Sequence, residues 1–458
     1  MRIWRTMGKI SPLMAVAAMT LTIAASAPAP RWDTPGDRNP LLPGYFADPS
    51  IVHHDRRWYI FATVDPWGDD HLALWTSTNG RDWTFSQPDW PSKAAAISPT
   101  AGDAKVWAPS VVQTRDGRWF MYVSIGSEVW VGTAPSPAGP WRDAHGGTPL
   151  IAKGFAPEYH MIDAEAFIDR NGQAYLYWGS GLNWTNGHCF AVRLKSDMVS
   201  LDGEPRDVTP ARYFEAPFMI RAGSHYVLTY SDGNTTKDTY KVRYAIGDTP
   251  FGPFREGPGS PILQTDRSRD VISPGHHAIV QTGGKAYILY HRQALPFPAS
   301  RNDTLRQVAI DPLTIHSDGS IAPVLPSHGD SVAGFAPTRT RGLPWRVSGK
   351  GLDALHGANR AADDNYATLW RPMPGEPATL SADLGTIRTV RESALRMEFP
   401  NLRYAITIAA SEDGRRWHTV RQNPEAQGSP ITMPHALRTR YLRLTVPSDA
   451  GVWEWQIR

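Results

Sequence analysis

Three acidic residues begin runs that otherwise have the pattern of buried strands. Asp48 opens "DPSIV", Asp163 opens "DAEAFI" and Glu215 opens "EAPFMI". A carboxylate at the head of an apolar strand costs free energy unless it is paired, solvated or used. Two carboxyl groups across a sugar-sized cleft suit the hydrolysis of a glycosidic bond, because one protonates the leaving oxygen and the other activates water. A third can raise the pKa of the acid by like-charge repulsion.

Acids at strand starts can also cap turns or bind metal ions. Asp often caps a turn, which would account for any one of the three alone, and clustered carboxylates are common metal ligands. The three acids stand far apart in the chain, with no Asp-x-Asp ladder. The acid–base interpretation therefore requires a fold that brings them together.

A unit of strands recurs five times, beginning at residues 48, 108, 163, 215 and 276, so that the steps are 60, 55, 52 and 61 residues. Each unit has an apolar strand, a turn built on Asp, Gly or Asn, an aromatic strand, and then a third strand with a polar edge segment. Four strands repeated at this period are typical of a β-propeller. The sequence predicts an all-β protein with a five-bladed β-propeller over residues 38–328. A β-sandwich with long loops would not explain why the layout recurs.

The propeller would bring the candidate residues to one place. The first strand of every blade lines the central axis, and the five strands run in the same direction. The five first positions should therefore converge at one mouth of the channel: Asp48, Ala108, Asp163, Glu215 and the His276–His277 pair. Three carboxylates at the same repeat position are difficult to explain as independent turn caps.

Three tryptophans are candidates for the wall of a sugar pocket. Trp107 stands beside the second blade start in "VWAPS", and Trp67 and Trp178 fall at predicted rim or channel positions. Each alone would more often be a core residue. Together they fit a pocket that stacks sugar rings.

Composition and charge exclude some classes of function. A formal net charge of +3 over 458 residues, without a basic run, argues against nucleic acid as a partner. The single cysteine, Cys189, excludes an intramolecular disulfide and is expected to be a small buried apolar residue. Stability must therefore come from a large core, which a chain of this length can supply.

Residues 1–27 have the pattern of an export signal. A positive segment with Arg2, Arg5 and Lys9 precedes the apolar run of residues 13–25, and small residues follow. The run is too short to favour a spanning helix, and no other segment approaches about 20 apolar residues. We expect a secreted or periplasmic protein that has no membrane span after cleavage.

Residues 38–328 resemble glycoside hydrolase family 43. The motifs that carry the resemblance are, in chain order, "YFADPSIV", "VWAPSVV", "MIDAEAFID", "YLYWGSG", "YFEAPFMI", "YVLTYS", "PGHHAIV" and "YILYHRQ". Their order and spacing make the set specific, whereas each motif alone is weak. The resemblance implies a five-bladed propeller that cleaves arabinose- and xylose-containing oligo- or polysaccharides with inversion, and that needs no cofactor for the chemistry itself.

The resemblance also implies roles for individual residues. Asp48 is similar to the family's general base, which deprotonates the attacking water, and Glu215 to its general acid, which protonates the leaving oxygen. Asp163 would orient Glu215 and keep it protonated. Arg292, in "YHRQ", matches a position that reaches the substrate beside the base. His276, in "GHH", matches a position near the axis that in many members helps to bind a structural cation, often Ca²⁺.

Two motifs depart from the family pattern. The third reads Asp-Ala-Glu where the family usually has Asp-Pro, and the fourth reads Glu-Ala-Pro where Glu-Gly-Pro is common. Both keep the acid, so the expected chemistry is unchanged. Glu165 lies two positions after Asp163 and would share its strand face. It is expected to contact either the substrate or the structure around the acids.

The repeat stops after residue 328. Residues 329–349 are rich in Gly, Pro, Ser and Thr and have the composition of a linker. Residues 350–458 resemble a discoidin-like β-sandwich, a jelly roll of the galactose-binding type, through "ADDNYATLWRP", "AITIAASEDGRRWHTV" and "RYLRLTV". Such domains are also used as carbohydrate-binding modules. Sugar binding and a purely structural cap on the propeller both remain open.

These expectations describe an exported inverting glycosidase that removes terminal sugars, with α-L-arabinofuranosyl units of plant-type polysaccharide as the leading substrate. A β-xylosidase or a galactan- or galactofuranoside-directed exo-enzyme is the nearest alternative, since the same three acids serve all of them. A non-catalytic sugar-binding propeller is the alternative of another class, and the presence of all three acids argues against it. The related sucrose-cleaving propellers carry Asn-Asp-Pro-Asn and Arg-Asp-Pro motifs, which this chain lacks.

Overall fold

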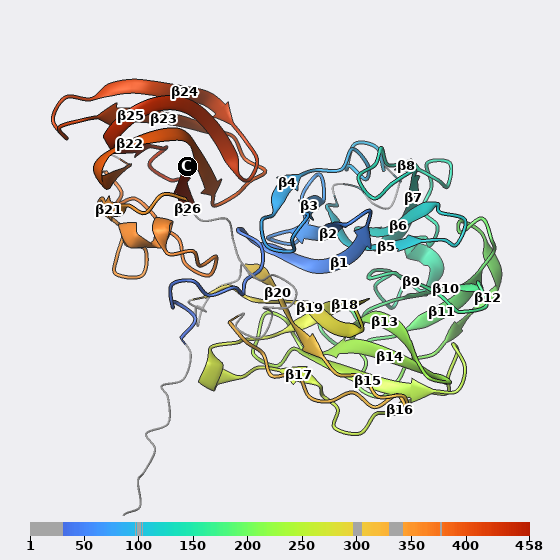
Figure 1. Cartoon of the computed structure of the whole chain (residues 1–458). Helices are drawn as coiled ribbons and strands as arrows, with labels where there is room; N and C mark the ends of the chain where they lie inside the picture. The colour runs from blue at the N-terminus through green and yellow to red at the C-terminus, as the bar shows by residue number, and fades with distance from the viewer. Residues whose placement is uncertain are drawn as a thin grey trace, which may run out of the picture.

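The computed structural model describes residues 31–458 except residues 97, 99–101, 103, 296–304, 329–341 and 376–377. It shows a ring of five small sheets followed by a C-terminal sandwich, which lies at the upper left of Figure 1. The helical segments among the described residues are short 3-10 turns. The predicted all-β architecture, a five-bladed β-propeller followed by a β-sandwich, is confirmed.

Each sheet of the ring is one blade, whose strands follow one another in chain order from the axis outward. The strands are β1 (Phe46–His54), β2 (Arg57–Val64), β3 (Ala73–Ser77) and β4 (Thr84–Ser86); β5 (Val106–Gln113), β6 (Trp119–Ile125), β7 (Glu128–Ala134) and β8 (Arg142–Asp143); β9 (Glu165–Ile168), β10 (Ala174–Trp178), β11 (Phe190–Leu194) and β12 (Leu201–Asp207); β13 (Glu215–Ala222), β14 (His225–Asp232), β15 (Lys241–Gly247), β16 (Arg255–Glu256) and β17 (Leu263–Gln264); and β18 (Gly275–Thr282), β19 (Lys285–Gln293) and β20 (Arg306–Leu313). The first strands contact one another in a closed cycle, β1–β5–β9–β13–β18–β1, which makes them the wall of the axis.

The beginning of each first strand has the same unusual backbone. Five residues, one in each blade, have φ between 38° and 59°: Asp48, Ala108, Asp163, Ala216 and His276. This left-handed region costs free energy for residues other than glycine and is retained where the surrounding structure demands it. In four blades a β-bulge follows directly, where the pairing of the first and second strands shifts register.

This backbone corrects one detail of the predicted repeat. The predicted repeat placed Glu215 at the same position as Asp48 and Asp163, and that placement is wrong by one residue. Ala216, not Glu215, has the left-handed conformation that marks the position. Glu215 therefore extends from the preceding position and approaches the channel mouth from a different direction.

The segment before β1 closes the ring against the fifth blade. The side chain of Asn39 pairs with the backbone of Ile310 as a neighbouring strand would: Oδ1 accepts from its N–H (3.1 Å) and Nδ2 donates to its carbonyl oxygen (2.8 Å). The Leu41 N–H donates to the carbonyl oxygen of Val308 (2.8 Å). The outer edge of β20 is thus covered by residues from the N-terminal side of the chain.

The C-terminal sandwich has six strands around an apolar core. They are β21 (Arg346–Ser348), β22 (Thr379–Met397), β23 (Tyr404–Ser411), β24 (His418–Ala426), β25 (Ile431–Thr445) and β26 (Val452–Ile457). The strand order is β21-β22-β25-β23-β24, with β26 also paired to β22. The pairing of β22 with β25 is interrupted by bulges, so that both long strands bend around the core that contains Trp370 and Trp455.

Some predictions fall on residues that are not described. The predicted signal peptide, residues 1–27, and residues 329–341 of the predicted linker lie outside the described residues. Within the described part of the chain, no helix has the length and apolar character needed to cross a membrane. Cys189 is fully buried, as expected of a small apolar residue.

Candidate active site

A cavity of about 370 Å³ opens at the axis where the first strands begin, and all three predicted acids reach it. Below it, the first strands enclose a second cavity of about 20 Å³, which has room for about one water molecule. The two cavities share Asp163 and His276 in their walls, and the main one lies where the first strands begin. Its wall is formed by Asp48, Trp67, Trp107, His160, Ile162, Asp163, Ser180, Gly181, Leu182, Asn183, Trp184, Phe214, Glu215, Thr235, His276 and Arg306.

Asp48 is almost fully buried (2% exposed) among polar groups. Arg306 Nη1 donates to its Oδ1 (3.0 Å), and Thr63 Oγ1 donates to its Oδ2 (2.7 Å). The Nδ1 atoms of His276 and His291 each lie 3.1 Å from Oδ1. Burial alone would raise the pKa of this carboxyl, but Arg306 and the two histidines outweigh burial and hold the pKa well below its usual value. Asp48 is therefore ionised at neutral pH and can accept a proton from water.

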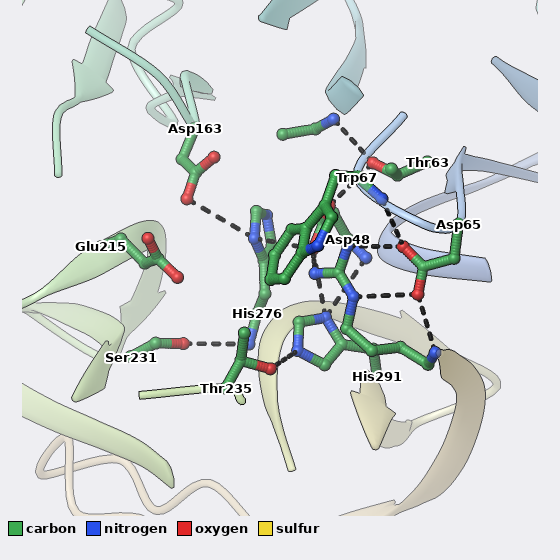
Figure 2. Close-up of polar contacts among 12 residues, drawn as sticks. Asp48, Thr63, Asp65, Trp67, Asp163, Glu215, Ser231, Thr235, His276 and His291 are labelled. Atoms are coloured by element: carbon green, nitrogen blue, oxygen red, sulfur yellow. Dashed lines mark hydrogen bonds and ion pairs between the residues drawn. The ribbon is translucent and has the colours of Figure 1, made fainter. Parts of the chain in front are cut away.

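Arg306 is fixed beside Asp48 by a second buried carboxylate. Its Nη2 donates to Asp65 Oδ1 (2.6 Å) and its Nε to Asp65 Oδ2 (3.0 Å), which makes a bidentate pair. Its guanidinium also lies 4.8 Å from the centroid of the Trp67 ring. Figure 2 shows Asp65 and Trp67 close to Asp48. Arg306 and Asp65 were not among the site residues predicted from the sequence.

Glu215 lies apart from Asp48, on the far side of His276 (Figure 2). Tyr240 donates its hydroxyl to Glu215 Oε1 (2.6 Å), and Ser180 donates Oγ–H to Oε2 (2.9 Å). Burial raises the pKa of Glu215 to about 7, although these two hydrogen bonds oppose the rise. Glu215 therefore keeps its proton through most of the range in which Asp48 is ionised, and it can donate that proton.

Asp163 completes the set of acids. It is 5% exposed, and its Oδ2 lies 3.5 Å from His276 Nδ1, so that His276 stands between the carboxylates of Asp48 and Asp163 (Figure 2). Burial, and then the charges of Glu215 and Asp48, raise the pKa of Asp163 well above its usual range. Asp163 and Glu215 therefore titrate as a pair that retains a proton at neutral pH.

The pKa values of the acids thus shift in opposite directions within one cavity: that of Asp48 is lowered, and those of Asp163 and Glu215 are raised. Asp48 is stabilised as a carboxylate by its ion pair with Arg306, whereas among the described residues Glu215 and Asp163 form no ion pair with Lys or Arg. Carboxyl groups whose pKa values are separated in this way can serve as base and acid in the same reaction. The arrangement suits the hydrolysis of a glycosidic bond by a water molecule activated at Asp48 and a leaving oxygen protonated by Glu215.

Two of the three predicted tryptophans line the cavity. Trp67 and Trp107 do, and Trp184 and Phe214, which the sequence analysis missed, continue the aromatic wall. Trp184 is 38% exposed, with its ring 6.1 Å from that of Trp67 and stacked on Phe214 at 5.6 Å. The available signal was an apolar ring among turn residues in "GLNWTNG", which is unusual unless the ring has a surface to contact.

The prediction that Trp178 contacts the substrate is wrong. Its ring is fully buried at the end of β10 and packs against Phe155 (5.7 Å) and Phe190 (5.9 Å) in the core between blades. The core interpretation of an isolated tryptophan is the correct one here.

The prediction that Arg292 reaches the substrate is also wrong. Its Nη1 and Nη2 donate to the carbonyl oxygens of Ser327 (2.9 Å) and Asn39 (2.9 Å). The side chain therefore stabilises the contact between the fifth blade and the segment before β1. Side chains alternate along a strand, and it is the preceding residue, His291, that faces Asp48. The arginine beside the base comes instead from the next strand, as Arg306.

Glu165 lies below the acids. It lines the small lower cavity and accepts a hydrogen bond from Ser110 Oγ (2.6 Å). It does not line the main cavity, so its position favours the structural alternative over substrate contact. Burial raises the pKa of Glu165 to about 8, which keeps this carboxyl protonated at neutral pH.

His276 was expected to help bind a structural cation such as Ca²⁺. Burial lowers the pKa of His276 to about 4, so the ring is neutral, but its Nδ1 is already shared between Asp48 and Asp163. Among the described residues, no group of three or more His, Cys, Asp or Glu side chains is arranged to hold a metal ion. Because Ca²⁺ prefers six to eight oxygen ligands, these side chains do not by themselves make a Ca²⁺ site. A structural cation on the axis stays a prediction.

The propeller and its separated carboxyl groups define a class of glycoside hydrolases. The chain belongs to glycosyl hydrolases family 43, whose family model matches residues 37–321. A second model, the F5/8 type C domain, matches residues 347–458. The protein is thus a hydrolase of O-glycosyl bonds with the inverting mechanism that is characteristic of this family, and the family resemblance seen in the sequence is confirmed.

Similar proteins include hydrolases of furanose sugars. A β-D-galactofuranosidase of Aspergillus niger is 30% identical over 306 residues, which cover 62% of this chain and 84% of that protein. An arabinoxylan arabinofuranohydrolase of Paenibacillus polymyxa is 26% identical over 351 residues, which cover 68% of this chain and 55% of that protein. A solved structure of a glycoside hydrolase is similar across both domains, with a TM-score of 0.75, 25% identity, and coverage of 91% of this chain and 98% of that chain.

Proposed function

We propose that this protein is an exported exo-glycosidase that removes terminal α-L-arabinofuranosyl units from plant-type polysaccharide with inversion. The observation that carries the proposal is the cavity of about 370 Å³ in which Asp48, Asp163 and Glu215 converge. This volume is near the small end of the range for ligand pockets, and it favours the end of a glycan chain over a long internal stretch.

In this proposal each acid has one role. Asp48, held as a carboxylate by Arg306, takes a proton from the attacking water. Glu215, with its raised pKa, gives its proton to the leaving glycosidic oxygen. Asp163 orients the acid and helps to keep a proton on the pair of carboxyl groups, because the charge of Glu215 raises the pKa of Asp163 and the two titrate together. Trp67 and Trp107, on the cavity wall, stack on the sugar ring.

The choice of sugar rests on the relatives. The names of both reported relatives refer to five-membered sugar rings, as an arabinofuranohydrolase and a galactofuranosidase. Other relatives are named as β-xylosidases, so the preference for a furanose as the terminal sugar rests chiefly on the relative that is 30% identical. β-D-Galactofuranose is the second candidate, because the relative that is 30% identical is a β-D-galactofuranosidase. β-Xylosidase activity is the third candidate, and the test described next would detect it.

The test is hydrolysis of three aryl glycosides by the full-length protein: 4-nitrophenyl α-L-arabinofuranoside, β-D-galactofuranoside and β-D-xylopyranoside. We expect release of 4-nitrophenol from the arabinofuranoside, and its loss in Glu215→Ala. Activity on the galactofuranoside or the xyloside alone would replace arabinose by that sugar. Activity on none of these, together with intact arabinan, arabinoxylan and galactan, would contradict the proposal. Proton NMR of the first product anomer tests inversion directly.

Export is tested separately from activity. The segment of residues 1–27, with Arg2, Arg5 and Lys9 before an apolar run, supports export. Mass spectrometry of the protein from the culture medium or periplasm should find an N-terminus close to residue 27. A protein that keeps Met1 and stays in the cytoplasm would contradict this part of the proposal.

A further inference from the structure

The C-terminal sandwich contacts the propeller beside the strand that carries the catalytic base (Figure 1). Tyr45, immediately before β1, inserts its ring into an apolar cluster of the sandwich, 5.3 Å from Trp453 and 5.5 Å from Phe399. Its hydroxyl donates to Glu398 Oε1 (3.2 Å), and Arg371 also pairs with Glu398. A residue three positions before Asp48 is thus anchored in the second domain.

A second anchor flanks Arg306. Gln307 Nε2 donates to the backbone carbonyl oxygen of Tyr366 in the sandwich (2.8 Å). On the other flank, Leu305 packs against the cluster that contains Tyr45 and Tyr366. The residues on both sides of Arg306 are therefore held by the sandwich, while Arg306 itself points to Asp48.

A third anchor holds the loop between β2 and β3, which carries Asp65 and Trp67. Asn401 Nδ2 in the sandwich donates to Asp69 Oδ2 (2.8 Å). At the other end of this loop, the Asp65 N–H donates to the carbonyl oxygen of Tyr45 (3.1 Å). The loop is thus fastened at both ends, directly or through Tyr45, to the second domain.

We propose that the C-terminal sandwich is a positioning element of the active site, which holds Asp65 and Arg306 and through them orients the Asp48 carboxylate for base catalysis. None of the described sandwich residues lines the cavity, so the domain acts through others. This role differs from both a sugar-binding module and a passive cap. It does not depend on which sugar the enzyme releases.

The size of the effect follows from the geometry that catalysis requires. Displacing a catalytic group by about 1 Å can cost about 10²-fold in rate. Arg306 donates to Asp48 and Asp65 at once, so that a shift of its backbone must change both contacts. Loss of an interface hydrogen bond that sets this backbone should therefore reduce kcat, with little effect on the binding of an aryl glycoside.

The test compares three full-length variants. Tyr45→Phe removes the contact to Glu398, and Gln307→Met removes the contact to Tyr366 together with a longer one to the carbonyl oxygen of Gly44 (3.4 Å); both keep the packing volume. The matched control is Arg360→Met, which removes contacts from the sandwich to Asp33 O (2.8 Å) and Asp33 Oδ2 (3.0 Å) and involves no cavity residue. The substrate is whichever of the three 4-nitrophenyl glycosides the wild type hydrolyses, assayed well below the melting temperature of each variant.

We expect Gln307→Met and Tyr45→Phe to lower kcat by roughly 10- to 100-fold, with KM changed by less than about threefold. Arg360→Met should lower the melting temperature but leave kcat unchanged. In an Asp65→Asn background the Gln307→Met change should have no further effect on kcat, because both changes act through Arg306. Unchanged kcat in both interface variants, or losses that simply add to that of Asp65→Asn, would overturn the proposal.

A crystal structure of Gln307→Met gives a readout that is independent of activity. The guanidinium of Arg306 should be displaced from the Asp48 carboxylate, whereas in Arg360→Met it should keep its place. An unmoved Arg306 in Gln307→Met would refute the proposal even if none of the aryl glycosides is hydrolysed. This readout therefore tests the positioning role of the sandwich even if the proposed substrate is wrong.

Discussion

Glu215 and Asp48 share one cavity, yet their carboxyl groups have opposite surroundings. Asp48 accepts a hydrogen bond from Arg306, whereas Glu215 accepts hydrogen bonds from the hydroxyl groups of Tyr240 and Ser180. Burial penalises the charge on both groups, and Arg306 opposes that penalty at both, but it outweighs the penalty, together with two histidines, at Asp48 alone of these two. The proposed division into base and acid therefore depends on the direct contact between Arg306 and Asp48.

Glu215→Gln should lower kcat by about 10²- to 10⁴-fold on a 4-nitrophenyl glycoside, because a general acid contributes about that much. The loss should be smaller on the 2,4-dinitrophenyl glycoside, whose leaving group needs less protonation. Steady-state kinetics on the two substrates checks this. Glu158→Gln, at an exposed position of the rim, is the control and should be fully active. Equal losses on both leaving groups would remove Glu215 from the role of acid.

Tyr240→Phe should move the basic limb of the pH–rate profile to higher pH by about one unit. The Tyr240 hydroxyl stabilises the ionised form of Glu215 and lowers its pKa, so its loss raises that pKa and the acid keeps its proton to higher pH. Asp163→Asn should move the same limb to lower pH, because Asp163 and Glu215 titrate as a pair and the change removes the repulsion that delays loss of the last proton. Shifts in the same direction for both variants would contradict the assignment.

Glu165→Gln should flatten the dependence of stability on pH. Burial raises the pKa of Glu165 from 4.5 to about 8 in the folded state, so between these values the folded state holds a proton that the unfolded state has lost. Stability from this group is thus present below about pH 4.5 and is lost as the pH rises toward about 8. Melting temperatures between pH 5 and 8 measure the slope, which the control Glu158→Gln should leave unchanged.

At the scale of elements, the loop of residues 181–187 decides how the cavity is closed. Asn183, Trp184 and Asn186 have φ of 52°, 63° and 56°. A Cβ at Gly181 would lie 1.8 Å from the carbonyl oxygen of Thr185, so this position has no room for a side chain. Left-handed residues persist where the surroundings over-determine them, often at binding sites. The loop therefore holds the Trp184 indole at the mouth as a rigid wall.

Trp184→Ala should raise KM for an arabino-oligosaccharide by about 5- to 30-fold, which corresponds to about 1–2 kcal/mol of lost stacking. The effect should be smaller on an aryl glycoside that lacks a second sugar. Phe155→Ala, which removes another exposed ring (41% exposed) that does not line the cavity, is the control. Unchanged KM in Trp184→Ala would show that the ring makes no contact with the substrate.

At the scale of the whole molecule, the two domains share a buried aromatic interface. Tyr45 is 6% exposed in a cluster with Tyr366, Leu369 and Trp453 of the sandwich. The segment before β1 also reaches both domains, since Asn39 pairs with β20 and Asn365 of the sandwich donates to the carbonyl oxygens of Trp32 (2.9 Å) and Thr34 (3.0 Å). Unfolding of one domain must therefore expose apolar surface of the other.

Calorimetry of the full-length protein should show one cooperative transition, because the interface couples the domains. Tyr45→Ala should cost about 3 kcal/mol or more, the usual range for a buried aromatic ring, and should separate the transition into two. Tyr45→Phe keeps the ring and should keep the single transition. Two well-separated transitions in the wild type would show that the domains unfold independently.

The repeat, the number of blades and the three acids at the mouth follow from the amino-acid sequence alone. Five units with the same order of apolar strand, turn and aromatic strand leave little choice of fold, and the first strands of a propeller must converge on its axis. Asp48, Asp163 and Glu215 could be found for that reason, although the left-handed residue of the fourth blade is Ala216, so that Glu215 lies one position before the place that Asp48 and Asp163 occupy in their blades.

The cation and the aromatic rings that join the acids depend instead on how the strands and loops pack in three dimensions. Arg292 and Arg306 are both charged residues on neighbouring apolar strands, and a single strand sequence does not reveal which of its two faces lies toward the axis. Trp178 and Trp184 differ because one ends a core strand and the other stands on a loop whose path depends on its neighbours. Contacts across blades and between domains join residues hundreds of positions apart, as Arg306 with Asp48 and Glu398 with Tyr45, and no local pattern encodes them.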